Sequence, residues 1–186
     1  MLTGRGNGRR LAFFLAGLFA VLHSPEPAWC HVTDTMPDAV AEMEYQILLD
    51  FQPDKVDVRN KLAMVLYRKK KFKEAEAELR TVLAQEPANF NALDGLGLVM
   101  SQTDRVKEAI PQFLAAIKAN PQDVMVQYHL GQAYAMLGDF VAAGKAFTQA
   151  LELASQPTAT ATPASDLDAI RKAAEQNNQQ LGAVKK

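Results

Sequence analysis

Apolar side chains recur along most of this chain at spacings of three and four residues, the period of one face of an α-helix. Between residues 90 and 121 two such stripes are separated by a short polar break at residues 102–104, and the segment ends at Pro121. A second helix that starts so soon after the first must turn back along it, so this segment predicts a helical hairpin. The segments before and after it have the same plan.

The hairpin recurs in register at a constant interval. Full units cover residues 56–89, 90–123 and 124–157, and a half unit covers residues 38–53 and ends at Pro53. The recurring small and aromatic positions are Ala63, Gly97 and Gly131, then Ala75, Ala109 and Ala143, then Phe113 and Phe147.

This spacing resembles the tetratricopeptide repeat, a helix-turn-helix unit of about 34 residues. The resemblance implies an all-α fold: a right-handed α-solenoid of helical hairpins, with an N-terminal half repeat and a C-terminal helix. The match departs from the family pattern at Arg59, Ala63 and Leu66 in the first unit, and Ser155 stands where the last unit would carry its proline.

Packing explains the recurring residues. Small side chains are expected where the two helices of a hairpin approach, and overpacking there costs about 1–3 kcal/mol. Gly131→Leu is therefore expected to lower the melting temperature. The aromatic residues are expected between hairpins, and Asn89 and Asp123 are expected to cap the helices that follow them.

The resemblance also implies where a partner binds, because solenoids of this family commonly hold peptide or protein segments on the concave surface lined by the first helix of each repeat. The inward positions, carried over by register, form the candidate groove. They are Asn60, Met64 and Tyr67 in the first unit, Asn91, Asp94, Leu98 and Ser101 in the second, and Met125, Tyr128, His129, Gln132 and Met136 in the third.

One branch of the family grips acidic C-terminal tails of its partners with a clamp of Lys, Asn and Arg on these positions. This chain has Asn60 and Met64 at the leading clamp positions and Met125 and His129 at the later basic ones. The substitutions argue against recognition of an acidic tail.

The groove positions are instead rich in Met, Tyr and Leu, side chains that adapt to varied apolar partners. Leu98 and Tyr128 are the strongest candidates for partner contact, and packing against neighbouring helices is the alternative role for each groove residue. A doubly substituted Leu98→Arg, Tyr128→Ala variant is expected to fold and to lose its partner.

Residues 1–30 have the plan of a secretory signal peptide. Arg5, Arg9 and Arg10 precede an uninterrupted apolar run at residues 11–22, which is too short to span a bilayer as a helix. A buried helix is the alternative. Cleavage is expected after Cys30, which predicts a periplasmic or secreted protein with no integral membrane span.

Cys30 is the single cysteine, so an intrachain disulfide is excluded. A lipoprotein signal would place a small residue before the cysteine, where this chain has Trp29. The pair Cys30 and His31 resembles the end of a c-type haem attachment motif, but Pro27 replaces its first cysteine. Lipidation and haem attachment are therefore both disfavoured.

The chain beyond residue 157 changes character. Thr and Ala alternate between two prolines, which predicts a linker at residues 158–164. Nothing in the sequence supports O-glycosylation of this linker. Leu167, Ile170 and Ala174 then form a weak apolar stripe that fades into a polar run. We expect a short helix in residues 165–186, followed by a flexible tail; the helix either caps the last repeat or lies free.

The charge and motif content of the chain argue against several classes of function. The formal net charge of −1 offers no basic face for nucleic acid. The one basic cluster, residues 68–73, falls at a turn, where a solvated charge run is the ordinary reading and contact with anionic lipid is the alternative. No nucleophile motif, P-loop or His-rich cluster is found, so no enzyme activity, cofactor or metal site is predicted.

The sequence therefore predicts a non-catalytic adaptor or assembly factor of the cell envelope that binds a peptide or protein segment in its groove. The alternative is a structural scaffold that self-associates into a homo-oligomer through its ends or its groove.

Overall fold

The computed structural model describes residues 37–156 and 162–184, which contain helices and no strand. The predicted signal peptide with its cleavage site, Cys30, and most of the predicted linker lie outside these residues. The helices are α2 (Asp38–Phe51), α3 (Val56–Arg68), α4 (Phe72–Gln85), α5 (Phe90–Gln102), α6 (Val106–Ala119), α7 (Val124–Met136), α8 (Phe140–Ala154) and α9 (Ala164–Val184).

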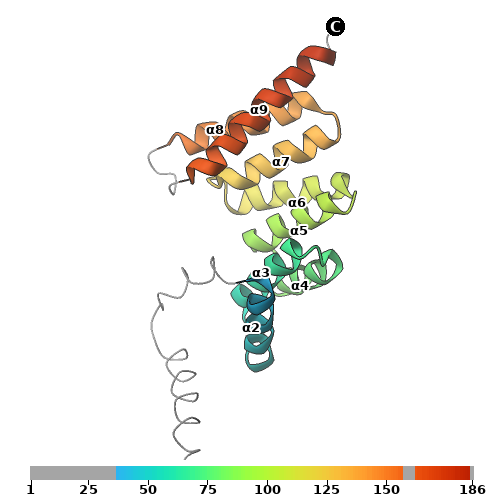
Figure 1. Ribbon diagram of the computed structural model, residues 1–186, viewed down its shortest axis with the longest axis vertical. Helices are drawn as coiled ribbons and strands as arrows, with labels where there is room; N and C mark the ends of the chain where they lie inside the picture. The colour runs from blue at the N-terminus through green and yellow to red at the C-terminus, as the bar shows by residue number, and fades with distance from the viewer. Residues whose placement is uncertain (1–36, 157–161, 185–186) are drawn as a thin grey trace, which may run out of the picture. The chain divides into compact units, whose positions relative to one another are not determined.

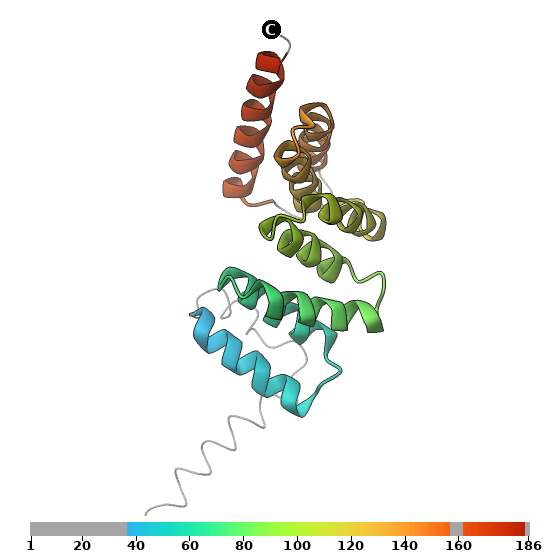
Figure 2. The ribbon, with the colours of Figure 1, turned by 90° about the vertical axis from the view of Figure 1, so that its right-hand side faces the viewer.

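The helices form antiparallel hairpins that follow one another in chain order (Figure 1). Pairs α3/α4, α5/α6 and α7/α8 are the hairpins, and their first helices begin at Val56, Phe90 and Val124, a constant step of one repeat length. Each helix packs against the next, and α3 also contacts α5 as α5 contacts α7. Figure 2 shows the same succession from the side. The predicted fold class, an all-α solenoid of helical hairpins, is confirmed.

The helices begin and end where local chemistry requires. The side chains of Asn89 and Asp123 accept hydrogen bonds of 3.0 Å from the backbone N–H groups of Ala92 and Val126, which caps α5 and α7 as predicted. Asp139 caps α8 in the same way. Such caps satisfy donors that the first turn of a helix leaves free.

Close approach within each hairpin depends on glycine. A Cβ atom at Gly131 would lie 2.5 Å from the ring of Phe147, and one at Gly97 would lie 2.5 Å from the ring of Phe113. The aromatic rings therefore fill space inside their own hairpins. Phe113 also reaches the next hairpin, where its ring centroid lies 6.0 Å from that of His129.

Helix α2 packs with the face that matches the later repeats. Ala41 and Tyr45, which precede Ala75 and Leu79 by one repeat length, are buried. The apolar stripe on its other side is exposed: Val40 by 49%, Met43 by 63%, Ile47 by 51% and Phe51 by 76%. Nothing among the described residues covers this stripe.

Helix α9 differs most from expectation. It is a 21-residue helix that continues through the polar run to Val184, and it packs against α8 and α7. Ile170 is fully buried and joins Val124, Ala150 and Leu153 in a small apolar cluster. The end of the solenoid is thus covered by α9.

Candidate functional site

A pocket of about 900 Å³ lies between the first helices of the repeats and α9. The first helices contribute residues near their C-terminal ends, because the constant repeat length places equivalent positions side by side. α9 forms the facing wall. The lining residues are Tyr67, Leu98, Ser101, Gln102, Phe113, His129, Gln132, Ala133, Ala135, Met136, Phe140, Phe147, Ala173, Gln176, Asn177, Gln179 and Gln180.

Half of the predicted groove residues meet in this pocket. Tyr67 comes from α3, Leu98 and Ser101 from α5, and His129, Gln132 and Met136 from α7. The set contains both polar and apolar side chains, so a bound segment would meet both.

Asp94 lies behind the pocket wall, against His129. Its carboxylate lies 2.9 Å from Nδ1 of His129, and both side chains are more than four-fifths buried. The His129 ring also packs at 5.9 Å from the Tyr128 ring. These contacts fix the orientation of the imidazole at the pocket, although Asp94 does not line it.

Tyr67 lines the edge of the pocket, and burial changes the pKa of its phenol. Tyr67 is half-buried against the ring of Phe72, at a centroid distance of 5.8 Å. Desolvation raises the pKa of Tyr67, and the side chain of Gln102 partly offsets this by a hydrogen bond. Tyr67 is therefore a neutral hydrogen-bonding group at physiological pH.

Asn60 requires a correction. It is only 6% exposed, and its amide donates a hydrogen bond of 3.1 Å to Oδ1 of Asn89, the residue that caps α5. The side chain is held in the contact between repeats, so it does not reach the pocket.

Tyr128 also differs from its predicted role as a leading contact residue. Its ring packs 6.0 Å from that of Phe147 and against the cluster around Ile170, and its hydroxyl accepts a hydrogen bond of 2.8 Å from Gln132. Burial raises its pKa. Tyr128 supports the pocket wall and does not line it, so Tyr128→Ala would disturb packing as well as binding.

The remaining predicted groove residues lie outside the lining. The thioether of Met64 points toward Gly95, and Met125 packs near Ile170. Asn91 is exposed at the start of α5. Register alone cannot separate these positions from the lining, because the facing wall comes from a helix outside the repeats.

Sequence reasoning missed that wall. Ala173, Gln176, Asn177, Gln179 and Gln180 of α9 all line the pocket. A signal was present: the stripe Leu167, Ile170 and Ala174 continues in helical steps to Asn177 and Leu181. Position 177 is asparagine, so the stripe of apolar residues that indicates a buried helix face is interrupted there.

Three of the five basic side chains at residues 68–73 pair with carboxylates of α2. Arg68 bonds to Asp38 at 2.6 Å, and both Lys69 and Lys71 pair with the buried carboxylate of Glu42. The ammonium groups, Lys69 first, hold the pKa of Glu42 below its usual range. Arg68, Lys69 and Lys71 thus join α2 to the first hairpin, a role that the sequence did not indicate. Lys70 and Lys73 are exposed, as expected for a solvated charge run.

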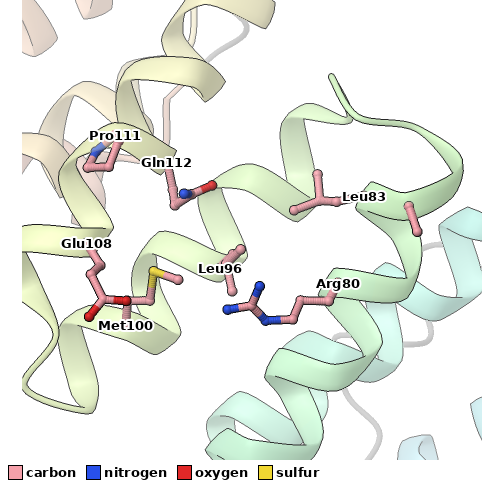
Figure 3. A pocket seen from close by; sticks show the side chains of 8 residues that line it. Arg80, Leu83, Leu96, Met100, Glu108, Pro111 and Gln112 are labelled. Atoms are coloured by element: carbon pink, nitrogen blue, oxygen red, sulfur yellow. The ribbon is translucent and has the colours of Figure 1, made fainter.

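A second cavity, of about 580 Å³, lies between α4, α5 and α6. Figure 3 shows Arg80 of α4 extending toward Leu96, with Glu108 and Pro111 on the side of α6. Arg80 is already bonded to Glu76. None of the predicted groove residues lines this cavity.

Membrane-spanning helices and metal-ligand clusters would each point to a particular function. In residues 37–156 and 162–184 no helix is both long and apolar enough to cross a membrane. The same residues hold no group of three or more His, Cys, Asp or Glu side chains arranged as metal ligands.

Comparison with known proteins decides the family. A model of the tetratricopeptide repeat matches residues 60–113 and again residues 96–159, which together exceed half of the chain. The chain belongs to the tetratricopeptide repeat family. The matched span begins inside α3 and includes the rest of the three hairpins whose first helices line the pocket.

Solved structures with the same repeat fold are similar to this tetratricopeptide protein. MamA 41-end from Desulfovibrio magneticus RS-1 is 25% identical, with a TM-score of 0.60 over 70% of this chain and 73% of that one. The Yersinia enterocolitica type III secretion chaperone SycD, solved with a peptide of the translocator YopD, is 15% identical, with a TM-score of 0.60 over 68% of this chain and 95% of that one. The latter likeness shows the fold alone.

Among curated proteins, the tetratricopeptide protein is 31% identical over 88 residues to a probable UDP-N-acetylglucosamine–peptide N-acetylglucosaminyltransferase, SPINDLY, of Hordeum vulgare. The match covers 47% of this chain and only 9% of that protein. Repeats of this kind serve generally as interaction scaffolds, and the short match does not carry the transferase activity.

Proposed function

We propose that this protein is a non-catalytic adaptor of the cell envelope that binds a segment of another protein in the pocket between α5, α7 and α9. The observation that carries the proposal is the pocket itself. Side chains from three successive repeats and from α9 converge on about 900 Å³. A cavity of this size with mixed lining is suited to several consecutive residues of a polypeptide.

The envelope location is supported by sequence. Three arginines at positions 5, 9 and 10 precede the apolar run at residues 11–22, the plan of an export signal. Fractionation of cells that produce the chain, followed by N-terminal sequencing, tests it. Recovery of the uncleaved chain in the cytoplasmic fraction would remove the envelope from the proposal.

Two matched substitutions test the pocket. Met136 lines it and Val141 does not, yet each side chain is 56% exposed, so Met136→Arg and Val141→Arg introduce the same charge at equal exposure. Met136→Arg is expected to weaken partner capture at least tenfold, because a bound segment would desolvate the guanidinium without supplying a counter-charge. Val141→Arg is expected to capture as the wild type does.

The measurement is quantitative affinity capture from envelope extract with wild type and both variants as bait. A partner retained by Val141→Arg and lost by Met136→Arg identifies the pocket as the binding surface. Equal recovery with both variants would place binding elsewhere. Circular dichroism melting of each variant excludes unfolding as the cause.

A second candidate, self-association into a scaffold, is favoured by the exposed stripe of α2. Val40, Met43, Ile47 and Phe51 form an apolar face without cover in the described residues. Light scattering over a range of concentrations tests this: a scaffold forms larger species as concentration rises, and Met43→Glu with Ile47→Glu abolishes them. A constant mass would rule the scaffold out.

A further inference from the structure

The pocket is unusual in the chemistry of its polar groups. Its lining contains no Asp, Glu, Lys or Arg side chain. The polar groups are instead carboxamides, hydroxyls and one imidazole, and α9 supplies four of the carboxamides. The carboxamides are those of Gln102, Gln132, Gln176, Asn177, Gln179 and Gln180.

Two lining residues carry polar atoms without partners. Asn177 is 3% exposed; its Nδ2 donates a hydrogen bond of 2.9 Å to the carbonyl of Phe140, which fixes the amide, and its Oδ1 has no partner among the described residues. Oγ of Ser101, on the facing helix α5, is likewise buried and unpaired. A buried polar atom without a hydrogen-bond partner destabilises the protein, so both atoms favour a ligand that brings hydrogen-bonding groups.

The carboxamide is the side-chain group that matches the peptide backbone. It offers N–H donors and a carbonyl acceptor, as each backbone unit does, so it can bond to a polypeptide whatever the side chains are. The unpaired carbonyl of Asn177 requires a donor, and a backbone N–H is the donor that every non-proline residue carries. The apolar members Leu98, Met136 and Phe140 leave room for uncharged side chains between these bonds.

No Asp, Glu, Lys or Arg side chain lines the pocket to act as a counter-charge, and the Asp94 carboxylate behind the wall is engaged with His129. Three basic groups near the turn after α3 are engaged on α2: Arg68 pairs with Asp38, and Lys69 and Lys71 pair with Glu42. A carboxylate or ammonium that enters the pocket would lose hydration without gaining an ion pair, which is costly.

We infer that the pocket takes an internal, uncharged stretch of polypeptide held through its backbone amides, and that α9 sets this preference. The inference deepens the proposed function and rests on it. It assigns to α9 a role in specificity in addition to covering the end of the solenoid.

The test uses the full-length chain and random 12-residue peptides displayed on phage, selected for binding and counter-selected against Met136→Arg. Sequences recovered are expected to be depleted of Asp, Glu, Lys and Arg at their central positions. One recovered peptide is then synthesised with a central glutamine and with glutamate in its place. The glutamate peptide is expected to bind at least tenfold more weakly.

A charge placed on α9 should reverse that preference. Gln176→Lys supplies the missing counter-charge in the pocket, so it is expected to recover binding of the glutamate peptide and to weaken binding of a matching lysine peptide. Gln149→Lys is the control, since Gln149 is exposed on α8 and does not line the pocket. It is expected to leave all three affinities unchanged.

The outcomes separate the two ideas. Peptides that lose binding with Met136→Arg but carry central charges as often as the unselected library would overturn the inference and leave the proposed function standing. The inference also falls if Gln176→Lys and Gln149→Lys behave alike. If no peptide depends on Met136, the proposed function falls as well.

Discussion

At the scale of single residues, hairpin geometry rests on the absence of a side chain at two positions. Gly97 and Gly131 let an aromatic ring lie where a Cβ would otherwise be, and Phe113 and Phe147 are almost fully buried as a result. Burying such a ring contributes about 1.5–3 kcal/mol, so the glycine cost in helix propensity is offset.

Gly131→Ala tests this contact against Gly182→Ala. Both glycines are helical, so alanine is favoured by helix propensity at both, by about 1 kcal/mol at Gly131 inside α7 and by less at Gly182 in the last turn of α9. A Cβ at Gly182 has nothing within 4 Å, whereas at Gly131 it meets Phe147 at 2.5 Å. The free energy of unfolding in urea is expected to be lower for Gly131→Ala than for Gly182→Ala by about 1–3 kcal/mol. Equal values would show that the ring moves aside without cost.

At the scale of elements, the turns inside the hairpins share one backbone conformation. Lys70, Asp104 and Gly138 have φ angles of 59°, 58° and 78°, in the left-handed region, and they occupy equivalent positions in successive repeats. Only the third position is glycine, the residue that adopts this conformation without steric cost.

Substitution of Gly138 tests the cost of the left-handed backbone conformation alone, because a Cβ there has no neighbour within 4 Å. Gly138→Ala is expected to lower the free energy of unfolding by about 1 kcal/mol, since alanine is strained at this φ angle. Gly138→Asn is the matched control: asparagine tolerates the left-handed region, so a smaller loss is expected. Urea unfolding measures both, and identical losses would point to the side chains and not to the φ angle.

At the scale of the whole molecule, ion pairs join successive repeats in register. Glu42 pairs with Lys71, and one repeat further along Glu76 pairs with Arg105. Hydrogen bonds from basic side chains lower the pKa of both carboxylates: Lys69 and then Lys71 act on Glu42, and Arg105 acts chiefly on Glu76. The next equivalent positions are Ile110 and Asp139, so this series ends after two interfaces.

The pKa of each carboxylate is lowered on folding, so its stabilisation is present above the ordinary value of 4.5 and is lost as the pH falls through the lower folded value. Glu76→Gln should destabilise the protein at neutral pH, and the difference from wild type should shrink in acid, where both side chains are uncharged. Urea unfolding across the pH range measures this. A pH-independent difference between Glu76→Gln and wild type would contradict the linkage.

The features that could be predicted from the sequence are those made by residues near one another in the chain. The constant repeat length, the capping residues Asn89 and Asp123, and the need for glycine at Gly97 and Gly131 all follow from spacing and side-chain size, because a helix face and a cap are made by residues near in sequence. The family and the hairpin order could therefore be predicted. Half of the predicted groove residues line the pocket, and their contact with a partner stays a prediction.

The rest depended on contacts between distant segments. Asn60 is buried because Asn89, in the same contact between repeats, holds its amide. Arg68, Lys69 and Lys71 pair with carboxylates on α2. The pocket has its facing wall only because α9 lies beside α7 and α8. The burial of Ile170 and Asn177 sets that position of α9. By itself the sequence determined the repeat and its packing face, since both have a period. Only the tertiary structure decided which polar groups face the pocket, because α9 lies outside the period.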